Sequence, residues 1–202
     1  MSQNQRQPPQ IFGFSGKLGV GKNYVAEELF YGSLPSNTMI MAFADHFKVD
    51  CVSKDDVDFE KVFVKKDEHT RRLLQLRGTE EGRDKYGDDI WIRTIETWIQ
   101  LYYQRGIDYF IITDVRFPNE AAWVRSVEGK TFRINAPNRN NKALNEESNG
   151  NPEMLQSIAT HVSETALDYY TEFDYVINND YGEESNVKEK IQSIIKKLKI
   201  RK

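Results

Sequence analysis

The chain has 202 residues, of which 39% are hydrophobic and 29% are charged, with a formal net charge of −3. This length suits one domain, or a core with a small insert, and the apolar fraction suffices for a packed core. The acidic balance excludes the strongly basic face typical of nucleic-acid-binding proteins, so an anionic substrate would need a local arginine cluster. A single cysteine, Cys51, excludes an internal disulfide framework and is typical of a reducing compartment.

The termini and the hydropathy pattern predict a cytoplasmic protein, in the host cytoplasm if the chain is viral. No apolar run approaches the ~18 residues of a membrane span, and residues 1–10 lack the apolar core of a signal peptide. We therefore expect no membrane and no nucleic-acid partner. Residues 1–10 are polar and include Pro8 and Pro9, which predicts a disordered tail before one folded domain at 11–202.

Strands and helices are predicted to alternate along the chain. The expected strands span 11–15, 39–43, 109–113, 131–134 and 174–178. The expected helices span 22–31, 45–52, 69–86, 88–105, 121–127, 152–158 and about 187–198. This alternation indicates an α/β fold with a mostly parallel sheet and helices on both faces. Residues 135–151 are almost wholly polar, and we expect a long loop there that serves as a lid, to about residue 160.

A glycine-rich stretch, Gly13 to Asn23, follows the first predicted strand and precedes the first predicted helix. Gly16, Gly21 and Lys22 fit the spacing G-x-x-x-x-G-K, in which glycines let successive amides point into one concavity beside a helix N-terminus. Lys22 would then reach the β- and γ-phosphates of a nucleotide. The alternative is a glycine-rich surface turn, but the strand–loop–helix context favours nucleotide binding. The candidate ATP-binding residues are Ser15, Gly16, Lys17, Gly19, Val20, Gly21, Lys22, Asn23, Tyr24 and Asn179.

Two residues are candidates for holding Mg²⁺ with ATP. Asn23 stands where Ser or Thr normally offers a hydroxyl to the metal, and its amide oxygen can still bind the ion or one of its waters. Asp114 follows a hydrophobic strand, in the position of the acid that holds Mg²⁺ in phosphate-loop enzymes. Arg116, two residues further on, would contact a phosphate. The alternative is an Asp–Arg pair that caps the next helix.

Several polar motifs follow predicted strands. Asp45, Asp114 and Asn179 each come directly or closely after an apolar run, as the glycine-rich loop does. Ligands bind at the carboxyl ends of the strands in parallel sheets, so we expect these motifs to converge. Arg139 lies in the polar stretch, where a lid arginine would neutralise charge that develops on a migrating phosphoryl group. The expected catalytic residues are Lys22, Asp114, Arg116 and Arg139.

A second phosphate site is predicted in the arginine-rich segment 71–83. Arg72 and Gln75 lie three apart on one helical face, and the planar guanidinium group suits a phosphate. The alternative is a solvated basic face. Ser163 and Glu164 are interpreted as a helix cap, and His161 has no partner motif for nucleophilic catalysis.

Five segments together resemble the deoxynucleoside monophosphate kinases of viruses and bacteriophages. They are the loop at 14–23, Phe43-Ala44-Asp45-His46-Phe47-Lys48, the run 71–80 with Trp91, Asp114-Val115-Arg116-Phe117-Pro118-Asn119-Glu120, and the pair of segments 161–164 and 174–177. The resemblance covers most of the chain from Ile11 onward.

That resemblance implies a three-layer P-loop kinase fold with a helical insert at about 45–105 that binds the acceptor, and transfer of the γ-phosphate of ATP to a deoxynucleoside monophosphate. It implies ATP with Mg²⁺ as the phosphate donor, and it leaves open whether the chain forms a homodimer. The acceptor-binding residues that it suggests are Asp45, Lys48, Arg72, Gln75, Gly78, Thr79, Arg83 and Trp91.

Two other functions stay open at this stage. Animal-type phosphomevalonate kinases are similar in the loop, the Asp-x-Arg motif and the last strand, but less so around 74–91. A slowly hydrolysing nucleotide-binding regulatory module is the alternative from another class. It would need a guanine-recognition motif such as N-K-x-D, which the sequence lacks.

Overall fold

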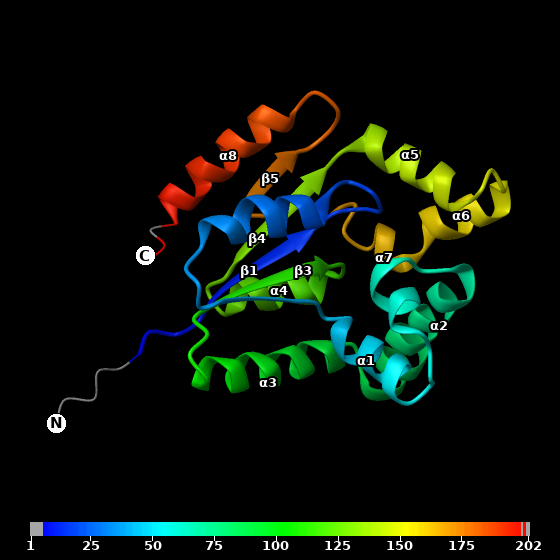
Figure 1. Ribbon diagram of the computed structural model, residues 1–202, viewed down its shortest axis with the longest axis horizontal. Coiled ribbons are helices and arrows are strands. Elements are labelled where there is room, and N and C mark those ends of the chain that lie inside the picture. The colour runs from blue at the N-terminus through cyan, green and yellow to red at the C-terminus, as the bar shows by residue number, and fades with distance from the viewer. Residues whose placement is uncertain (1–5, 199, 201–202) are drawn as a thin grey trace. The chain divides into compact units, whose positions relative to one another are not determined.

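The computed structural model describes residues 6–198 and 200, and it contains a five-stranded sheet with the order β2-β3-β1-β4-β5 (Figure 1). The central strand β1 pairs in parallel with β3 and β4, and β4 pairs in parallel with β5. The strands are β1 (Gln10–Ser15), β2 (Thr38–Met41), β3 (Tyr109–Val115), β4 (Lys130–Asn135) and β5 (Tyr175–Asn178).

Helices alternate with these strands along the chain, as the sequence pattern predicts. They are η1 (Tyr24–Phe30), η2 (Tyr31–Ser33), α1 (Asp45–Ser53), η3 (Glu60–Val64), α2 (Glu68–Gly78), η4 (Thr79–Asp84), α3 (Ile90–Gln104), α4 (Pro118–Ser126), α5 (Pro137–Glu147), α6 (Pro152–Thr160), α7 (Val162–Thr165) and α8 (Glu184–Lys197). The α/β class and the mostly parallel sheet with helices on its faces are thereby confirmed.

The core explains why β1 lies in the middle of the sheet. Side chains alternate between the faces of a strand, and both faces of β1 are buried. On one face, Phe14 stacks on Phe132 at 4.5 Å between ring centroids, and Phe30 of η1 meets both rings edge to face. Apolar residues of α8 join this cluster. On the other face, Gly13 lies so close to Val124 of α4 that an added Cβ would come within 3.1 Å of it. Figure 1 shows η1 and α8 on one side of the strands and α4 on the other.

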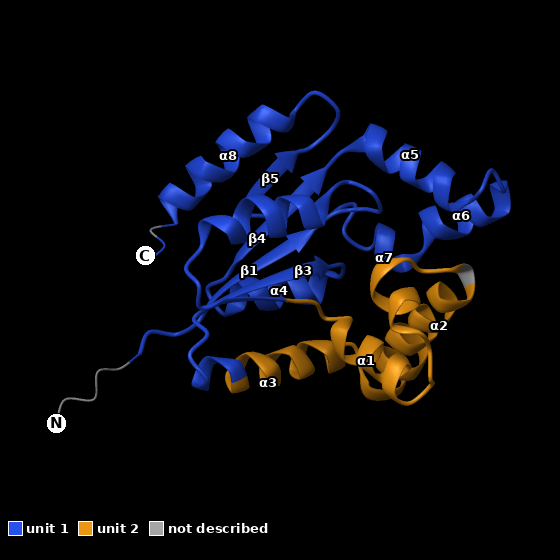
Figure 2. Ribbon diagram, viewed as in Figure 1, with its two compact units in different colours: residues 1–40, 102–202 blue, residues 41–101 orange. Residues whose placement is uncertain are grey.

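The chain divides into two compact units (Figure 2). Unit 1 comprises residues 1–40 and 102–202. It contains all the described strand residues of the sheet except Met41, the last residue of β2. Unit 2 comprises residues 41–101, close to the insert expected at about 45–105. Its own small core is built on Cys51, Val62 and Leu74, with partly buried Phe47 and Phe63 packed around them. Cys51 is fully buried and packs within this core.

The expectation of a structureless lid loop at 135–151 is wrong. α5 covers Pro137–Glu147, and α6 follows from Pro152. Pro137 and Pro152 each stand in a first helical turn, where the missing amide of proline costs nothing. The side chain of Asn151 caps α6 by accepting hydrogen bonds from the amides of Glu153 and Met154. Polar composition therefore concealed one helix, α5, whose start was signalled by Pro137, whereas α6 lies where a helix was expected at 152–158.

Two boundaries near functional positions also differ from the prediction. β3 continues to Val115, because Val115 is buried and pairs with Ser15, so Asp114 lies inside the strand. α4 begins at Pro118, three residues before the predicted start, and the Glu120 carboxylate accepts hydrogen bonds from the amides of Arg116 and Phe117.

The N-terminal segment was expected to be disordered over residues 1–10. Residues 1–5 lie outside the described residues. The guanidinium group of Arg6 pairs with the Asp108 carboxylate and lies 4.1 Å from the ring centroid of Tyr103, and β1 begins at Gln10. Across residues 6–198 and 200, none of the helices has both the length and the apolar character needed to span a membrane.

Candidate functional site

The loop between β1 and η1 is shaped by glycines at positions that other residues would strain. Gly19 and Gly21 have φ angles of +71° and +79°, in the left-handed region that favours glycine. A Cβ on Gly21 would lie 2.3 Å from the Nδ2 atom of Asn179, and one on Gly19 would lie 2.2 Å from the Cβ atom of Ala143 in α5. The loop therefore has glycine both for its curvature and for the close approach of its neighbours.

Lys22 places its ammonium group inside this loop. Its Nζ atom donates a hydrogen bond to the carbonyl oxygen of Gly16 over 3.0 Å. Burial, followed by the positive charge of Arg116, lowers the pKa of Lys22 to about 8, while Glu164 and Asp114 oppose that shift. The loop thus holds a desolvated cation that an anionic ligand would stabilise.

Two arginines from neighbouring strand ends accompany Lys22. Arg116 follows β3, and Arg133 belongs to β4 and donates a hydrogen bond to the Ser15 hydroxyl over 3.0 Å. Burial lowers the pKa of Arg133, against the opposing effect of Asp168. The structure therefore brings together Lys22, Asp114 and Arg116, as the convergence of strand ends predicts. Arg133, which is not among the candidate site residues named from the sequence, belongs to the same cluster.

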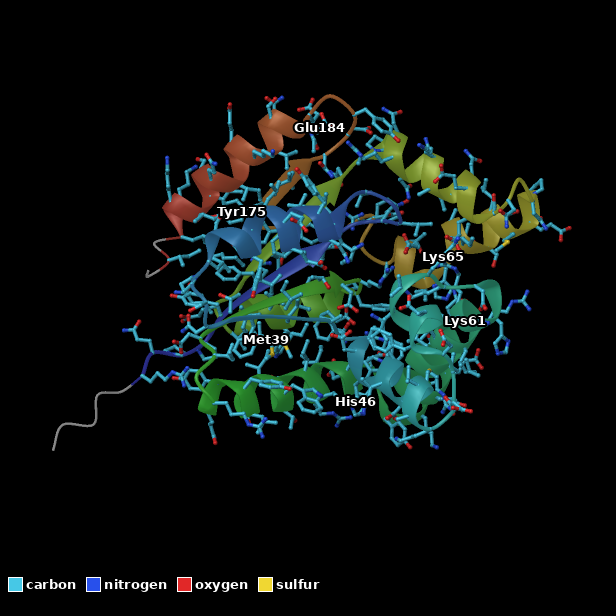
Figure 3. All side chains as sticks on the ribbon, viewed as in Figure 1. Met39, His46, Lys61, Lys65, Tyr175 and Glu184 are labelled. Carbon is cyan, nitrogen blue, oxygen red and sulfur yellow. The ribbon has the colours of Figure 1, made fainter. Side chains whose placement is uncertain are left out.

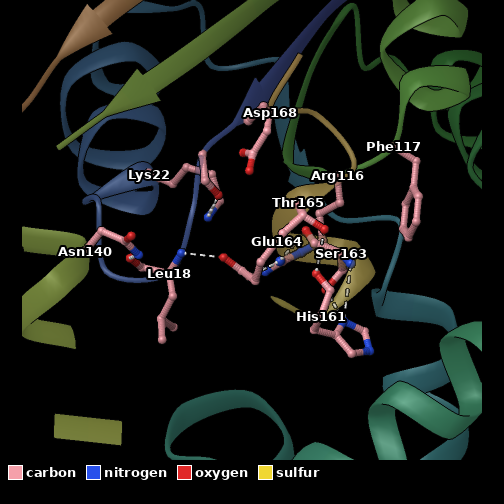
Figure 4. A network of polar contacts seen from close by, with 12 residues as sticks. Leu18, Lys22, Arg116, Phe117, Asn140, His161, Ser163, Glu164, Thr165 and Asp168 are labelled. Carbon is pink, nitrogen blue, oxygen red and sulfur yellow. Dashed lines mark hydrogen bonds and ion pairs between the residues drawn. The ribbon is translucent and has the colours of Figure 1, made fainter. Parts of the chain in front are cut away.

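Glu164 occupies the middle of these positive groups (Figure 4). One carboxylate oxygen accepts a hydrogen bond from the backbone amide of Leu18 over 2.8 Å, and the other pairs with the guanidinium group of Arg116 at 2.5 Å. The side chain of Glu164 is only 10% exposed. Burial acts to lower the pKa of Arg116, but the carboxylate of Glu164 outweighs it, so the pKa of Arg116 is raised. Sequence reasoning missed this role, because nothing in the local pattern ties residue 164 to residues 18 and 116.

The helix cap at this position is made by His161 and not by Ser163 and Glu164. The Nδ1 atom of His161 accepts a hydrogen bond from the amide of Ser163, in the first turn of α7 (Val162–Thr165), and lies 2.8 Å from the Ser163 hydroxyl. Burial, together with the nearby charge of Arg116, lowers the pKa of His161. A neutral imidazole is the form that accepts this bond, so α7 is held by an uncharged cap.

A second carboxylate from the same segment also contacts the loop. Asp168 lies four residues after Glu164, and its carboxylate pairs with Lys17 at 2.8 Å and with Arg133 at 3.8 Å. The segment 164–168 therefore supplies two acidic side chains to the positive groups around the loop. Lys17, predicted to bind ATP, makes its ion pair here.

Two amide side chains support the loop from outside. Asn179 is buried, and its Nδ2 atom donates to the carbonyl oxygen of Val20 over 2.9 Å. Asn140 of α5 donates in the same way to the carbonyl oxygen of Leu18 over 2.7 Å. Asn179, predicted to bind ATP, therefore fixes the backbone of the loop. Its sequence position after the last strand, followed by a turn, is the signal that located it.

Arg139 of α5, the predicted lid arginine, pairs with Glu184 at the start of α8, which is labelled in Figure 3. The distance between the two groups is 2.8 Å, and the guanidinium group also lies 4.5 Å from the ring centroid of Tyr181. The backbone amide of Arg139 donates to the carboxylate of Asp180. The side chain is thus engaged with the turn before α8, while the backbone of α5 packs against Gly19.

The metal-binding candidates offer a small set of oxygen donors. Asn23 is exposed in a helical conformation at the start of η1, and Asp114 is half-buried near Lys22. Across the described residues no cluster of three or more His, Cys, Asp or Glu side chains is arranged to hold a metal ion. Mg²⁺ is commonly held by one or two protein oxygens together with substrate phosphates. One carboxylate and one amide fit an ion that arrives with a nucleotide.

Unit 2 contains the predicted acceptor residues, and several of them serve its internal structure. The Asp45 carboxylate accepts from the amide of Ala42 over 2.7 Å and lies 3.4 Å from the ammonium group of Lys48. The indole nitrogen of Trp91 donates to the carbonyl oxygen of Gly78 over 2.8 Å. The ring of Trp91 leaves no room for a side chain at Gly82.

The remaining acceptor candidates lie on α2 and η4. Arg72 is an exposed residue of α2, and the carbonyl oxygen of Gln75 accepts the amide of Thr79 where α2 ends. Arg83 is buried and donates to the carbonyl oxygen of Asp88 over 2.9 Å. Arg83 therefore closes a turn within unit 2, a role that a charge pattern alone does not reveal.

A pocket of about 420 Å³ lies within unit 2. Trp91 is the one predicted acceptor residue among its lining, which also includes His46, Phe47, Tyr86, Lys85 and Thr94. Its lining combines aromatic rings with charged side chains of both signs, namely Asp50, Arg77, Glu81 and Lys85.

Comparison with known proteins gives stronger support to the fold than to any particular substrate. No family model matches the chain. A stretch of 55 residues is 44% identical to the deoxynucleoside-5'-monophosphate kinase of Escherichia phage T5, and it covers 27% of this chain and 21% of that protein. The chain therefore spans about a fifth of the length of this curated relative.

The solved structures show how the whole chain is folded. TT1252 from Thermus thermophilus superposes with a TM-score of 0.59 over 95% of this chain and 99% of that chain, at 15% identity. A shikimate kinase from Acinetobacter baumannii covers 96% of this chain and 97% of that chain at 14% identity and a TM-score of 0.49, too distant to support an argument. The first likeness shows the α/β fold alone.

Proposed function

We propose that the protein is an ATP-dependent kinase that phosphorylates a deoxynucleoside monophosphate. The observation that carries this proposal is the glycine-built loop with Lys22 inside it, beside Arg116 and Arg133 at the strand ends. Such a collection of buried positive groups suits a polyphosphate. The partial likeness to a deoxynucleoside monophosphate kinase supports the choice of acceptor.

In this proposal, catalysis depends on positioning and charge neutralisation, because phosphoryl transfer needs little covalent chemistry from the protein. The loop amides and Lys22 hold the β- and γ-phosphates of ATP. Arg116 stabilises the oxygens of the migrating group and orients the phosphate of the acceptor. Arg139 on α5 supplies a further positive charge when its guanidinium group leaves the Glu184 carboxylate and binds the nucleotide.

Asn23 and Asp114 are the side chains that would hold Mg²⁺ accompanying ATP. When bound, the ion neutralises charge on the phosphate oxygens. The amide of Asn23 orients one side of that site, and the carboxylate of Asp114 supplies its negative charge. Asp114 also stabilises the protonated form of Lys22.

The acceptor is assigned to unit 2. The pocket lined in part by Trp91, His46 and Phe47 suits a flat base, and Arg72 is an exposed cation on α2 that we assign to the phosphate of the acceptor. Asp45, Lys48, Gln75, Gly78, Thr79 and Arg83 are proposed to shape this region. Mevalonate 5-phosphate is the second acceptor to be considered, on the likeness of the loop and of the Asp-x-Arg motif.

A coupled assay with ATP, Mg²⁺ and a panel of ribo- and deoxynucleoside monophosphates plus mevalonate 5-phosphate tests the proposal. We expect ADP formation that depends on one or more deoxynucleotides, and a loss of turnover by orders of magnitude in Lys22→Ala. Near-normal turnover in that variant would sink the scheme. Slow ATP hydrolysis that no acceptor stimulates would favour a regulatory nucleotide-binding module.

A further inference from the structure

Glu164 makes contacts around the loop that a bound anion would otherwise make. Its two carboxylate oxygens accept from a loop amide, that of Leu18, and from the guanidinium group of Arg116. These are the two kinds of donor that bind phosphate oxygens in proteins, a backbone amide of a glycine-rich loop and a forked arginine. Figure 4 shows the Glu164 side chain reaching from α7 toward Leu18.

Asp168 extends the same arrangement by one helical turn. It pairs with Lys17 of the loop and with Arg133, which in turn donates to Ser15 at the end of β1. Two carboxylates from a five-residue segment thereby face four cations, namely Lys17, Lys22, Arg116 and Arg133, all within unit 1. The positive charge that would attract a polyphosphate is largely balanced from within the chain.

We propose that Glu164, assisted by Asp168, is an internal anion that occupies the phosphate loop until a polyphosphate displaces it. This inference rests on the proposed function in one respect, that the loop binds phosphates. The segment 161–168 then acts as a built-in competitor that keeps weak anions out of the loop, and its departure is part of nucleotide binding.

Displacement follows from the limits of the donors involved. The amide of Leu18 has one hydrogen to donate, and Glu164 accepts it. A phosphate oxygen that approached Arg116 while Glu164 stayed in place would meet a carboxylate that is only 10% exposed, where like charges repel strongly. α7 has only four residues and is held by the side chain of His161, so little regular structure opposes its movement.

Calorimetric titration of the whole chain with tripolyphosphate and with ATP, without Mg²⁺, tests the inference. We expect Glu164→Gln to bind tripolyphosphate about tenfold more tightly than the wild type, which corresponds to about 1.4 kcal/mol. Asp168→Asn should gain about threefold, because its ion pairs are more exposed. The matched control is Glu189→Gln on the exposed face of α8, for which affinity should stay unchanged.

The outcomes separate this inference from the proposed function. If the wild type binds tripolyphosphate in a Lys22-dependent manner but Glu164→Gln binds no more tightly, Glu164 is a permanent support for Arg116 and the inference alone is overturned. If neither protein binds tripolyphosphate, both proposals fall. Binding by the variant but not by the wild type would support the inference most strongly.

Amide hydrogen exchange of the wild type provides a second measurement that needs no variant. We expect ATP to slow exchange in peptides covering residues 16–22 and to accelerate it in peptides covering 161–168, because the loop gains a ligand while α7 loses its anchor. Slower exchange in both segments would overturn the inference, since it would mean that α7 stays in place around the bound nucleotide.

Discussion

The glycine-rich loop of unit 1 and the arginine-rich segment of unit 2 both carry positive side chains but are built differently. In the loop, backbone geometry comes first: two glycines in the left-handed region set the curve, and Lys22 bonds to a carbonyl oxygen of the loop itself. In the segment 71–83, Arg77 pairs with Asp55 and Glu81 at 2.5 Å each, and Arg83 bonds to a carbonyl oxygen.

This difference separates charge that serves a ligand from charge that serves the fold. The ion pairs of Arg77 are local and lie at the surface, with its side chain 33% exposed, so they hold helices together at low energetic cost. The cations around the loop are desolvated, as the lowered pKa values of Lys22 and Arg133 show. Desolvated charge of one sign is costly unless a ligand or an internal carboxylate compensates it.

The largest expected effect follows from removing Arg116. Arg116→Ala should lower turnover about 10³-fold, because a guanidinium group at the transferring phosphoryl group stabilises charge that builds up in the transition state. Steady-state rates with saturating ATP and acceptor measure it, and circular dichroism checks the fold. A loss of less than tenfold would mean that Arg116 serves α7 and not the reaction.

Gly21→Ala should disrupt the loop through its backbone. The φ angle of +79° and the 2.3 Å approach to Asn179 both oppose a side chain, so we expect a loss of about 1–3 kcal/mol in unfolding free energy. ATP affinity should fall more than tenfold, measured by titration. Gly32→Ala is the matched control, because a Cβ there has no atom within 4 Å. Equal effects in the two variants would contradict the special role of the loop.

The charge of Lys22 should cost stability below its lowered pKa of about 8. Between about pH 8 and 10.5 the unfolded chain binds more protons at this residue than the folded chain, so wild-type stability rises with pH in that window. Lys22→Met should therefore raise the melting temperature at pH 7, with a gain of about 1 kcal/mol that fades toward pH 10.5. Thermal unfolding at several pH values measures the difference. A gain that is independent of pH would contradict burial of the charge as its cause.

The smallest effect is expected in unit 2. Arg77→Gln removes two ion pairs at a partly exposed site, so it should cost less than about 1 kcal/mol. Arg77 also lines the pocket assigned to the acceptor, so the KM for the acceptor should rise by a few-fold while turnover at saturation stays within a few-fold of the wild type. Urea unfolding and the coupled assay measure these quantities. A loss of turnover comparable to that of Arg116→Ala would place Arg77 among the catalytic groups and remove the contrast between the two regions.

The fold and the loop were predictable because their causes are local. Apolar runs such as 109–113 and the spacing of Gly16, Gly21 and Lys22 are visible in any short window of the sequence. Helix α5 was missed because the polar composition of 135–151 outweighed the start signalled by Pro137, whereas α6 was expected at 152–158.

The contribution of Glu164 to the site could not be predicted from sequence patterns. Its partners lie 146 and 48 residues away in the chain, and their proximity depends on the path of the segment after α6. The same applies to Asn179, whose position was correctly singled out but whose bond to Val20, 159 residues away, no spacing rule predicts. Long-range pairing in a parallel sheet sets these contacts, and a single sequence specifies them only through the complete fold.

The central position of β1 also has a consequence for the order of folding. Residues 10–15 are synthesised well before their sheet partners, residues 109–115 and 130–133. The strand that carries the glycine-rich loop therefore stays unpaired while about a hundred further residues are synthesised, and pairings of such long range form slowly. The apolar run Ile11–Phe14 is accordingly the part of the nascent chain that most needs protection from aggregation.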